Sequence, residues 1–259
     1  MAEPLVSIVV PNWNTGPLLR LCLASVLRFS DPPCELIVVD NGSTDASRTT
    51  AAAAAGRGLV RLIDRAQAPA EAGATAHGAA LDAGLAAARA PFLFTLDSDA
   101  WAREPGWLGR FLAALEGVDA SHAGATKFPP GAWQRLGSWL TARRPGPESA
   151  YVRPCHALYR VDLLRRHGLS FGPVQVEGRS LTTGQAIHER LGAMGYRPAL
   201  LPHAEVERAV GHVRHATVVL NPEAFPTLRA RARQRGARAV ERLLAGEEAR
   251  AILRDAAFP

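Results

Sequence analysis

The feature that most constrains the fold is a mostly apolar run, Phe92 to Leu96, that ends in two aspartates one residue apart. Such a run predicts a strand inside a sheet that is covered on both faces, because a half-exposed strand would alternate apolar and polar residues. Asp97 and Asp99 follow this strand, with Ser98 between them. Ligands of open α/β sheets lie beyond the carboxyl ends of the strands, so this pair is predicted to face a binding site.

The chemistry of the pair indicates a metal–diphosphate site. Mg²⁺ and Mn²⁺ prefer oxygen ligands, and when few protein carboxylates are present they complete their coordination with water and substrate phosphates. Asp97 and Asp99 are close enough in sequence to approach one ion together. The alternative is that Asp-Ser-Asp only ends the strand and caps a helix, since both residue types favour turns and N-caps. The tripeptide alone leaves both interpretations open.

Two earlier apolar runs, Leu5 to Val10 and Glu35 to Asp40, have the same character. Between them, residues 17–29 carry apolar side chains at helical spacing. The order strand, helix, strand predicts parallel pairing, so that Asp40 and the aspartate pair emerge at the same edge of one sheet. The same reasoning predicts strands at 59–63, 151–159 and 196–201, and helices ending near 55 and spanning 75–89, 106–115, 161–167 and 182–194.

Two later segments have less regular patterns. Residues 123–144 place Trp133, Leu136, Trp139 and Leu140 at helical spacing, which we interpret as core or lid packing. Residues 171–179 are expected to form a loop that contains Glu177.

Composition agrees with one α/β domain and a modest extension in a chain of 259 residues. The net charge of +6 is carried almost wholly by arginine, whose planar guanidinium suits phosphate and carboxylate groups. The three cysteines, Cys22, Cys34 and Cys155, show no CxxC spacing, which argues against a disulfide framework or a structural zinc site. Because no apolar run reaches membrane length, a cytoplasmic protein is expected.

The last part of the chain, 221–259, is predicted to be an arginine-rich helical extension. It is interpreted as a helix packed on the domain. The alternative is a basic helix over 226–255 that touches an anionic membrane surface, which would place the protein at the inner face of the membrane. A nucleic-acid partner is not expected, because the chain has no basic groove interleaved with aromatic residues.

Taken together, three segments (6–14, 35–45 and 94–99) resemble family 2 glycosyltransferases of the GT-A fold. The resemblance implies a Rossmann-like α/β domain over 1–220, with a mostly parallel central sheet and helices on both faces. Residues 1–115 would be its nucleotide-binding half and 116–220 its acceptor half. It further implies Mn²⁺- or Mg²⁺-dependent transfer of a sugar from a UDP- or GDP-sugar to an acceptor hydroxyl. That acceptor would be a polysaccharide, a lipid-linked sugar or a small molecule, as in cell-envelope polysaccharide biosynthesis.

The resemblance also implies roles for single residues. In the family, the first nucleotide loop corresponds to Pro11, Asn12 and Asn14, and the acid that contacts the base corresponds to Asp40. The DxD motif that holds ribose and metal–diphosphate corresponds to Asp97, Ser98 and Asp99. A late histidine that completes the metal site matches His212, with His215 as the second choice, and a structural histidine is the alternative.

The sequence departs from the family at the position of the catalytic base. Where members have a Glu-Asp pair before a helix, this chain has Thr183 and Gly184. A base must reach the acceptor hydroxyl, so inverting transfer needs a substitute, for which Glu177 is the first candidate and His188 or Glu189 are weaker ones. Glu177 can equally be a solvated loop acid. Retaining transfer, or a catalytically silent domain that binds sugar nucleotides, are the alternative functions.

Two smaller departures concern the donor and acceptor sides. The Arg-Asn pair that many relatives have in the helix before the DxD strand is absent here, and His77 or Arg65 are its candidate substitutes. Cys155 and His156 occupy positions where relatives place acceptor-side residues. Packed strand residues are the favoured interpretation, and metal binding is the alternative.

Overall fold

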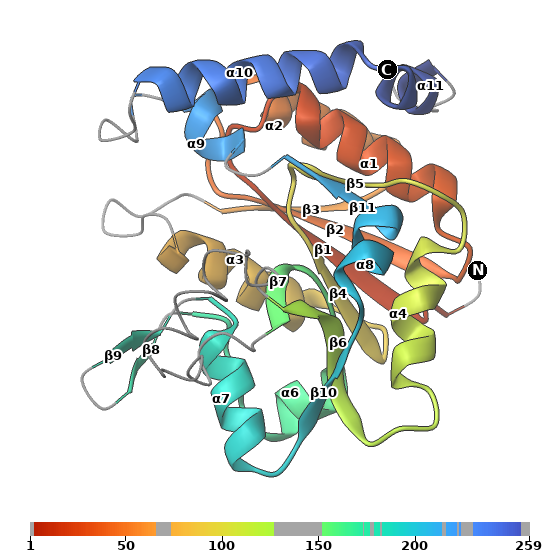
Figure 1. The fold of residues 1–259 in the computed structure, drawn as a ribbon, viewed down its shortest axis with the longest axis vertical. Helices are drawn as coiled ribbons and strands as arrows, with labels where there is room; N and C mark the ends of the chain where they lie inside the picture. The colour runs from red at the N-terminus through yellow and green to blue at the C-terminus, as the bar shows by residue number, and fades with distance from the viewer. Residues whose placement is uncertain are drawn as a thin grey trace, which may run out of the picture.

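The computed structural model describes residues 3–65, 74–126, 152–172, 174–176, 179–181, 183–213, 216–221, 223 and 230–254. Its centre is a seven-stranded sheet in the order β10-β6-β7-β4-β1-β2-β3 (Figure 1). These strands are β1 (Val6–Asn12), β2 (Cys34–Asp40), β3 (Arg61–Asp64), β4 (Phe92–Leu96), β6 (Ala120–Thr126), β7 (Val152–Arg160) and β10 (Arg197–Leu200).

The described sheet is mostly parallel, as predicted. β1 pairs in parallel with β2 and β4, β2 with β3, and β6 with β10. β7 runs antiparallel to both of its neighbours, β4 and β6. Two short antiparallel pairs lie outside this sheet: β5 (Ala100–Ala102) with β11 (Val210–His212), and β8 (Val174–Val176) with β9 (Arg179–Leu181).

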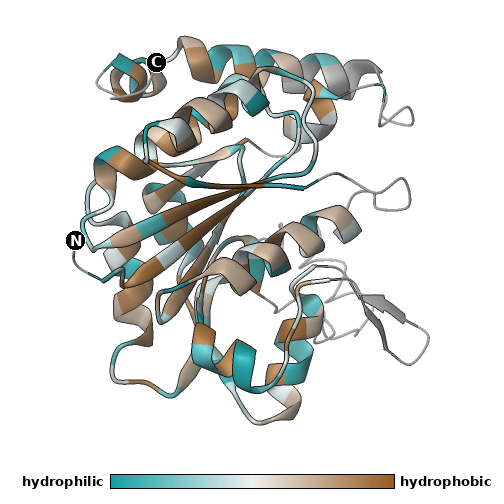
Figure 2. Ribbon diagram, turned by 180° about the vertical axis from the view of Figure 1, so that it is seen from behind, coloured by the Kyte–Doolittle hydropathy of each residue, from teal (hydrophilic) through white to brown (hydrophobic). Residues whose placement is uncertain are grey.

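Helices cover both faces of the sheet, which explains why its central strands are mostly apolar (Figure 2). Alternate side chains of one strand enter different cores, since Ile8 packs on one face and Val9 on the other. The core with Ile8 includes α1 (Pro17–Phe29), α2 (Ala46–Gly56), α4 (Trp107–Leu115) and α8 (His203–Ala209). The core with Val9 includes α3 (Ala74–Ala87), α6 (Val161–Arg166) and α7 (Gln185–Ala193).

Parts of the second half differ from the sequence-based expectation. Residues 123–126, assigned to a helical stripe, belong to β6, because they pair with β7 and β10 inside the sheet. Residues 174–176, assigned to a loop, form β8. The remainder of the tryptophan-containing stripe, 127–144, lies outside the described residues. Neither α8 nor β11 was predicted.

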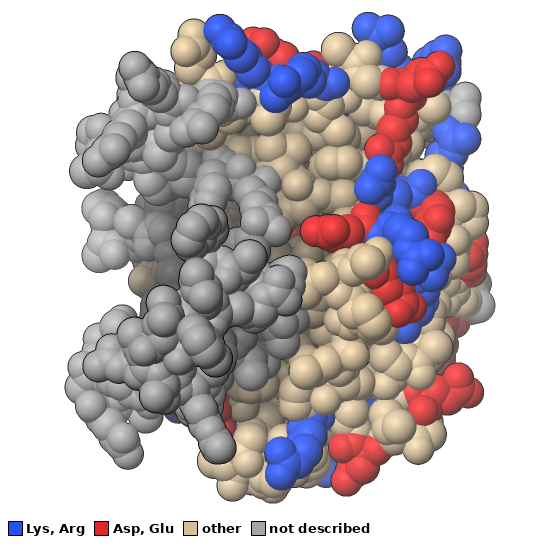
Figure 3. Space-filling view, viewed as in Figure 1, with Lys and Arg blue, Asp and Glu red and all other residues tan. Residues whose placement is uncertain are grey.

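The C-terminal helices α10 (Ala230–Ala245) and α11 (Glu247–Arg254) pack on the domain, beside α1 and α9 (Ala216–Leu220) (Figure 1). Val240, Ala249 and Ile252 are buried in these contacts. Along the upper edge of the molecule, where these helices lie, basic and acidic side chains are intermingled (Figure 3). The interpretation of the extension as a packed helix is therefore favoured. Among the described residues, no helix combines the length and apolar character needed to cross a membrane.

Candidate active site

The polar residues that follow β1, β2 and β4 meet at one edge of the sheet. The parallel register places Asn12 beside Asp40 and Val9 beside Thr95, so the three strands end together. In the loop after β2, Asn41 Nδ2 donates to the carbonyl oxygen of Ala76 at 3.2 Å. The next residue on α3, His77, has its Nε2 3.0 Å from Asp97 Oδ1. The acids predicted to converge therefore do lie along one rim, which is the sheet edge where β1, β2 and β4 end.

The loop after β1 is held by a buried polar network centred on Asn12. Its Nδ2 donates to Asp40 Oδ1 at 2.7 Å and also contacts the hydroxyls of Ser43 and Ser47. Asp40 is 2 % exposed, and its other oxygen accepts from the backbone N–H of Ser43 at 3.0 Å. The Asp40 carboxylate thus shapes the two loops, and a contact of Asp40 with a nucleotide base stays a prediction.

Asn14 joins this loop to two other segments. It adopts a left-handed backbone with φ of 50°, a conformation that asparagine tolerates better than most residues. Its Oδ1 accepts from the N–H of Thr44 at 2.7 Å, and its carbonyl oxygen accepts from Asn221 Nδ2 at 3.0 Å. Pro11 lies buried at the end of β1. The predicted nucleotide loop is therefore a preorganised structure at the rim.

His212 reaches the aspartate pair through strand pairing between distant parts of the chain. β11 pairs with β5, which follows Asp99 directly, and Ala100 lies opposite His212. His212 Nε2 lies 3.1 Å from Asp99 Oδ1. One ligand atom each of Asp97, Asp99 and His212 lies within 4.8 Å of the other two. Two carboxylate oxygens and an imidazole nitrogen suit Mn²⁺ well and Mg²⁺ acceptably, so the residues fit a divalent cation.

The ionisation of these groups follows from their mutual contacts. Burial disfavours the charged form of Asp97, but the hydrogen bond and charge of His77 outweigh it and lower the pKa of Asp97. Burial likewise opposes charge on His77 and His212, yet the adjacent aspartates raise the pKa of both histidines. The rim therefore keeps Asp97 ionised and, without an added cation, favours protonated histidines next to it.

His156 on β7 lies beside His212, with the two ring centroids 6.0 Å apart in an edge-to-face arrangement. Burial and the neighbouring His212 lower the pKa of His156 to about 4, so this imidazole is neutral near pH 7. Burial also raises the pKa of the adjacent Cys155 thiol, which remains protonated. Cys155 is thus buried on β7, which agrees with packing in the strand, whereas His156 faces a cavity. One ligand atom each of Cys155, His156 and His212 also lies within 4.8 Å of the other two, so metal binding stays the alternative.

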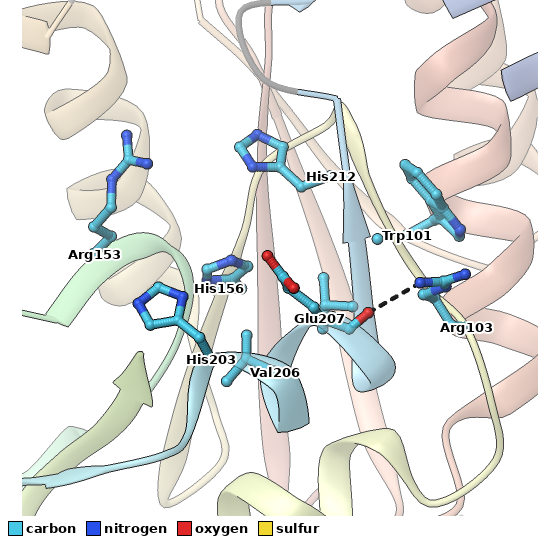
Figure 4. Close-up of a pocket in the computed structure, with 10 residues that line it drawn as sticks. Trp101, Arg103, Arg153, His156, His203, Val206, Glu207 and His212 are labelled. Carbon is cyan, nitrogen blue, oxygen red and sulfur yellow. Dashed lines mark hydrogen bonds between the residues drawn. The ribbon is translucent and has the colours of Figure 1, made fainter. Parts of the chain in front are cut away.

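That cavity, of about 310 Å³, opens beside His212 (Figure 4). Its wall comprises Trp101, Arg103, Arg153, His156, His203, Val206, Glu207, Val210, Gly211 and His212. The sequence analysis missed the residues that α8 contributes. A signal was present, because His203 and Glu207 are four residues apart and Val206 and Ala209 are apolar, which is the pattern of an amphipathic helix.

The sequence of this chain matches the profile of a known protein family. Residues 7–168, more than half of the chain, match the profile of glycosyl transferase family 2. The chain belongs to glycosyl transferase family 2. The matched range contains the predicted nucleotide loop, the aspartate pair and β7.

Curated relatives match this member of the family over short segments. A PGL/p-HBAD biosynthesis glycosyltransferase of Mycobacterium tuberculosis is 44 % identical over 45 residues, which is 17 % of this chain and 18 % of the relative. The uncharacterized glycosyltransferase EpsJ of Bacillus subtilis is 33 % identical over 97 residues, or 37 % of this chain and 26 % of the relative. The matches thus span only about a fifth to a quarter of these relatives.

Solved structures share the fold over most of the chain. A mannosyltransferase from Pyrobaculum calidifontis superposes with a TM-score of 0.56 at 19 % identity, covering 98 % of this chain and 86 % of that one. Glucosyl-3-phosphoglycerate synthase from Mycobacterium tuberculosis gives 0.52 at 19 % identity, covering 88 % and 82 %. At such identities the likeness concerns the fold, which is GT-A as predicted.

The residues predicted as candidate bases have different locations. Glu177 and His215 lie outside the described residues. His188 Nδ1 lies 3.3 Å from Nε2 of His122, which is buried. Gly184 precedes α7 with φ of 78°, and a Cβ there would meet the Pro154 ring at 3.0 Å. An aspartate or glutamate at position 184 would thus be strained by the left-handed backbone and by contact with Pro154. The backbone conformation therefore disfavours the carboxylate that family members have at this position.

Of the two candidate substitutes for the missing arginine, His77 contacts Asp97, as described above. Arg65 lies nearby, and its Nη1 donates to Asn41 Oδ1 at 2.9 Å. Ser98, between the two aspartates, is 5 % exposed. The structure therefore brings both candidates to the rim with the aspartate pair.

Proposed function

We propose that this protein transfers a sugar from a nucleoside-diphosphate sugar to a hydroxyl group of an acceptor. The observation that carries the proposal is the convergence of Asp97, Asp99 and His212 beside the loop ordered by Asn12. These residues come from distant parts of the chain and meet at the edge where an open α/β sheet binds its ligands. Family membership supports the same reaction class.

In this proposal Asp97, Asp99 and His212 would hold Mn²⁺ or Mg²⁺. Such a cation stabilises the negative charge of a nucleoside-diphosphate leaving group. The fold neighbours support this choice, since the mannosyltransferase was solved with GDP-Man and Mn²⁺ and the synthase with Mn²⁺ and UDP. The donor is accordingly a UDP- or GDP-sugar, with Pro11, Asn12, Asn14 and Asp40 on its nucleoside side and Ser98 between the aspartates.

The acceptor is proposed to be a glycolipid, a polysaccharide or a small molecule of cell-envelope biosynthesis. The name of the mycobacterial relative supports this class. A cytoplasmic site of action fits a donor of this kind. Contact of residues 226–255 with an anionic membrane would depend on exposed arginines such as Arg238, because the described apolar side chains of α10 and α11 pack toward the domain.

Inverting transfer is the proposed stereochemistry, with Glu177 as the base expected from the sequence. Retaining transfer is the second candidate, and the glycine at position 184 favours it, since no carboxylate occupies the position usual in the family. A silent nucleotide-sugar-binding domain is the third candidate.

The test uses purified full-length protein with Mn²⁺ and, separately, UDP-glucose, UDP-N-acetylglucosamine and GDP-mannose. Donor binding is measured by calorimetry, and turnover by release of the nucleoside diphosphate. The matched variants are Asp99→Asn at the site and Asp162→Asn on α6, an exposed acid at the opposite edge of the sheet. We expect turnover that Asp99→Asn abolishes and Asp162→Asn preserves. Binding without turnover would identify a silent domain, and absence of binding to any donor would refute the proposal.

A further inference from the structure

We propose that Glu207 is the carboxylate that takes the proton of the acceptor hydroxyl, and that α8 forms the wall of the acceptor site. This inference rests on the proposed transfer reaction and identifies the base that the family position lacks. It names a residue of the described cavity in place of Glu177.

The placement of Glu207 is the first argument. Figure 4 shows the Glu207 carboxylate projecting into the cavity toward His212, with His156 beside it. His212 contacts Asp99, so the carboxylate faces the donor side of the rim across the cavity. Buried Val206 and Ala209 anchor α8 in the core, and Val206 lines the cavity next to Glu207.

A second feature of the cavity wall is the imidazole ring of His203. His203 Nε2 is buried and has no hydrogen-bond partner among the described residues. Buried polar atoms in native proteins are nearly always hydrogen-bonded, so one that lines a cavity indicates a partner supplied by a ligand. His203 and Glu207 are one helical turn apart and line the same cavity. Together they offer an acceptor sugar two polar contacts.

The third argument is rigidity. α8 runs directly into β11, so Glu207 and the metal-site residue His212 belong to one continuous segment. Arg103 Nη1 donates to the carbonyl oxygen of Glu207 at 3.0 Å, and its Nε and Nη2 bind both carboxylate oxygens of Glu248 at 2.8 and 3.1 Å. This clamp from α11 holds the backbone of Glu207 in place, and a preorganised base is what efficient proton transfer requires.

The step is a single displacement at the sugar. The O–H bond of the acceptor breaks and its proton passes to a carboxylate oxygen of Glu207. The acceptor oxygen forms the new bond to the anomeric carbon on the face opposite the departing phosphate oxygen. The bond from that carbon to the phosphate oxygen breaks, and its electron pair leaves with the nucleoside diphosphate. The product therefore has the inverted configuration.

The experiment uses the full chain and the donor that the assay above selects, with water in place of the acceptor, so that donor hydrolysis is the reaction. The variants are Glu207→Gln, Glu207→Ala and the control Glu205→Gln, which changes another carboxylate of α8 that does not line the cavity. General-base catalysis typically contributes about 10²- to 10⁴-fold, so we expect Glu207→Gln to lower the hydrolysis rate by at least about 100-fold. Donor affinity and melting temperature should stay at their wild-type values, and Glu205→Gln should hydrolyse the donor at the wild-type rate.

Added formate should restore hydrolysis to Glu207→Ala, because a small carboxylate can occupy the vacated space. A structural role for Glu207 would give no such rescue. Wild-type turnover that Glu207→Gln leaves unchanged, or a product of retained configuration, would overturn this inference while leaving the transfer function intact. A wild-type protein that binds no donor, or binds one without turnover, would instead overturn the transfer function and this inference with it.

Discussion

Replacement of Gly211 by alanine tests how β11 is held against the site. A Cβ at this position would lie 2.2 Å from both Cε2 and Cζ2 of Trp101. Carbon atoms in contact are normally about 3.5–4.0 Å apart, so the ring or the strand must move by more than about 1 Å. The indole ring cannot move easily, because it packs with Leu21 and Ile252 and donates from Nε1 to Glu248 at 3.2 Å. We therefore expect β11 to shift.

The shift should have two measurable effects. Overpacking of this kind costs about 1–3 kcal/mol, which for a chain of this size corresponds to a fall in melting temperature of roughly 2–12 °C. His212 follows Gly211 directly, so a displaced strand also lengthens the 3.1 Å contact between His212 and Asp99. Mn²⁺ affinity should fall with it. Thermal unfolding followed by circular dichroism and calorimetric titration with Mn²⁺ measure the two effects.

The control is Gly109→Ala on α4, where an added Cβ meets nothing within 4 Å. Alanine there should be neutral or stabilising by up to about 1 kcal/mol, because it favours the helix. Because the clash is with the Trp101 ring, the effects of the two substitutions should not be additive. Gly211→Ala should lower the free energy of unfolding by less in a Trp101→Leu background, where the ring is gone. A Gly211→Ala protein that melts like Gly109→Ala, or a cost that is the same in both backgrounds, would refute this reasoning.

Three further predictions concern charge at the site and in the core. Asp99→Asn should weaken Mn²⁺ binding by more than about tenfold in calorimetry, since a ligand is lost. Mn²⁺ binding to the wild type should weaken as pH falls from 8 to 6, because the pKa of His212 is raised above 6.5 and a protonated imidazole cannot ligate a metal. Since one proton is displaced, the affinity should fall by no more than about tenfold per pH unit. Burial, aided by the nearby His188, lowers the pKa of His122 to about 3. The unfolded state therefore binds more protons between pH 6.5 and 3, and stability is lost as pH falls through that window. Urea unfolding at pH 7 and pH 4.5 measures this loss. Between these two pH values, the free energy of unfolding of His122→Gln should fall by about 2 kcal/mol less than that of the wild type.

Much of the first half of the fold could be predicted from local patterns. Residues 6–40 contain two apolar runs separated by a helical repeat, and burial on both faces of a parallel sheet leaves few other arrangements for them. The shared edge for Asp40 and the aspartate pair followed from the same rule, and the register of β1 with β2 and β4 confirms it. These inferences succeeded because the apolar pattern within each run and the common direction of the strands are enough to decide them.

The second half was harder to predict for a physical reason. β6 begins with the residues Ala120 to Gly124, which carry little apolar periodicity, so only its pairing with β7 and β10 makes it a strand. β11 has three residues and exists because it pairs with β5. Short strands such as these owe their existence to partners that the local sequence does not reveal.

The sequence by itself determined the α/β architecture, the sheet edge predicted to bind a ligand and the aspartates that lie there, since these follow from periodicity and strand direction. Only the tertiary structure decided that His77 and His212 flank those aspartates, that Asp40 bonds to Asn12 and Ser43, and that α8 lines the neighbouring cavity. The physical reason is that these contacts join residues far apart in the chain, and their geometry is set by packing and strand pairing across the whole domain.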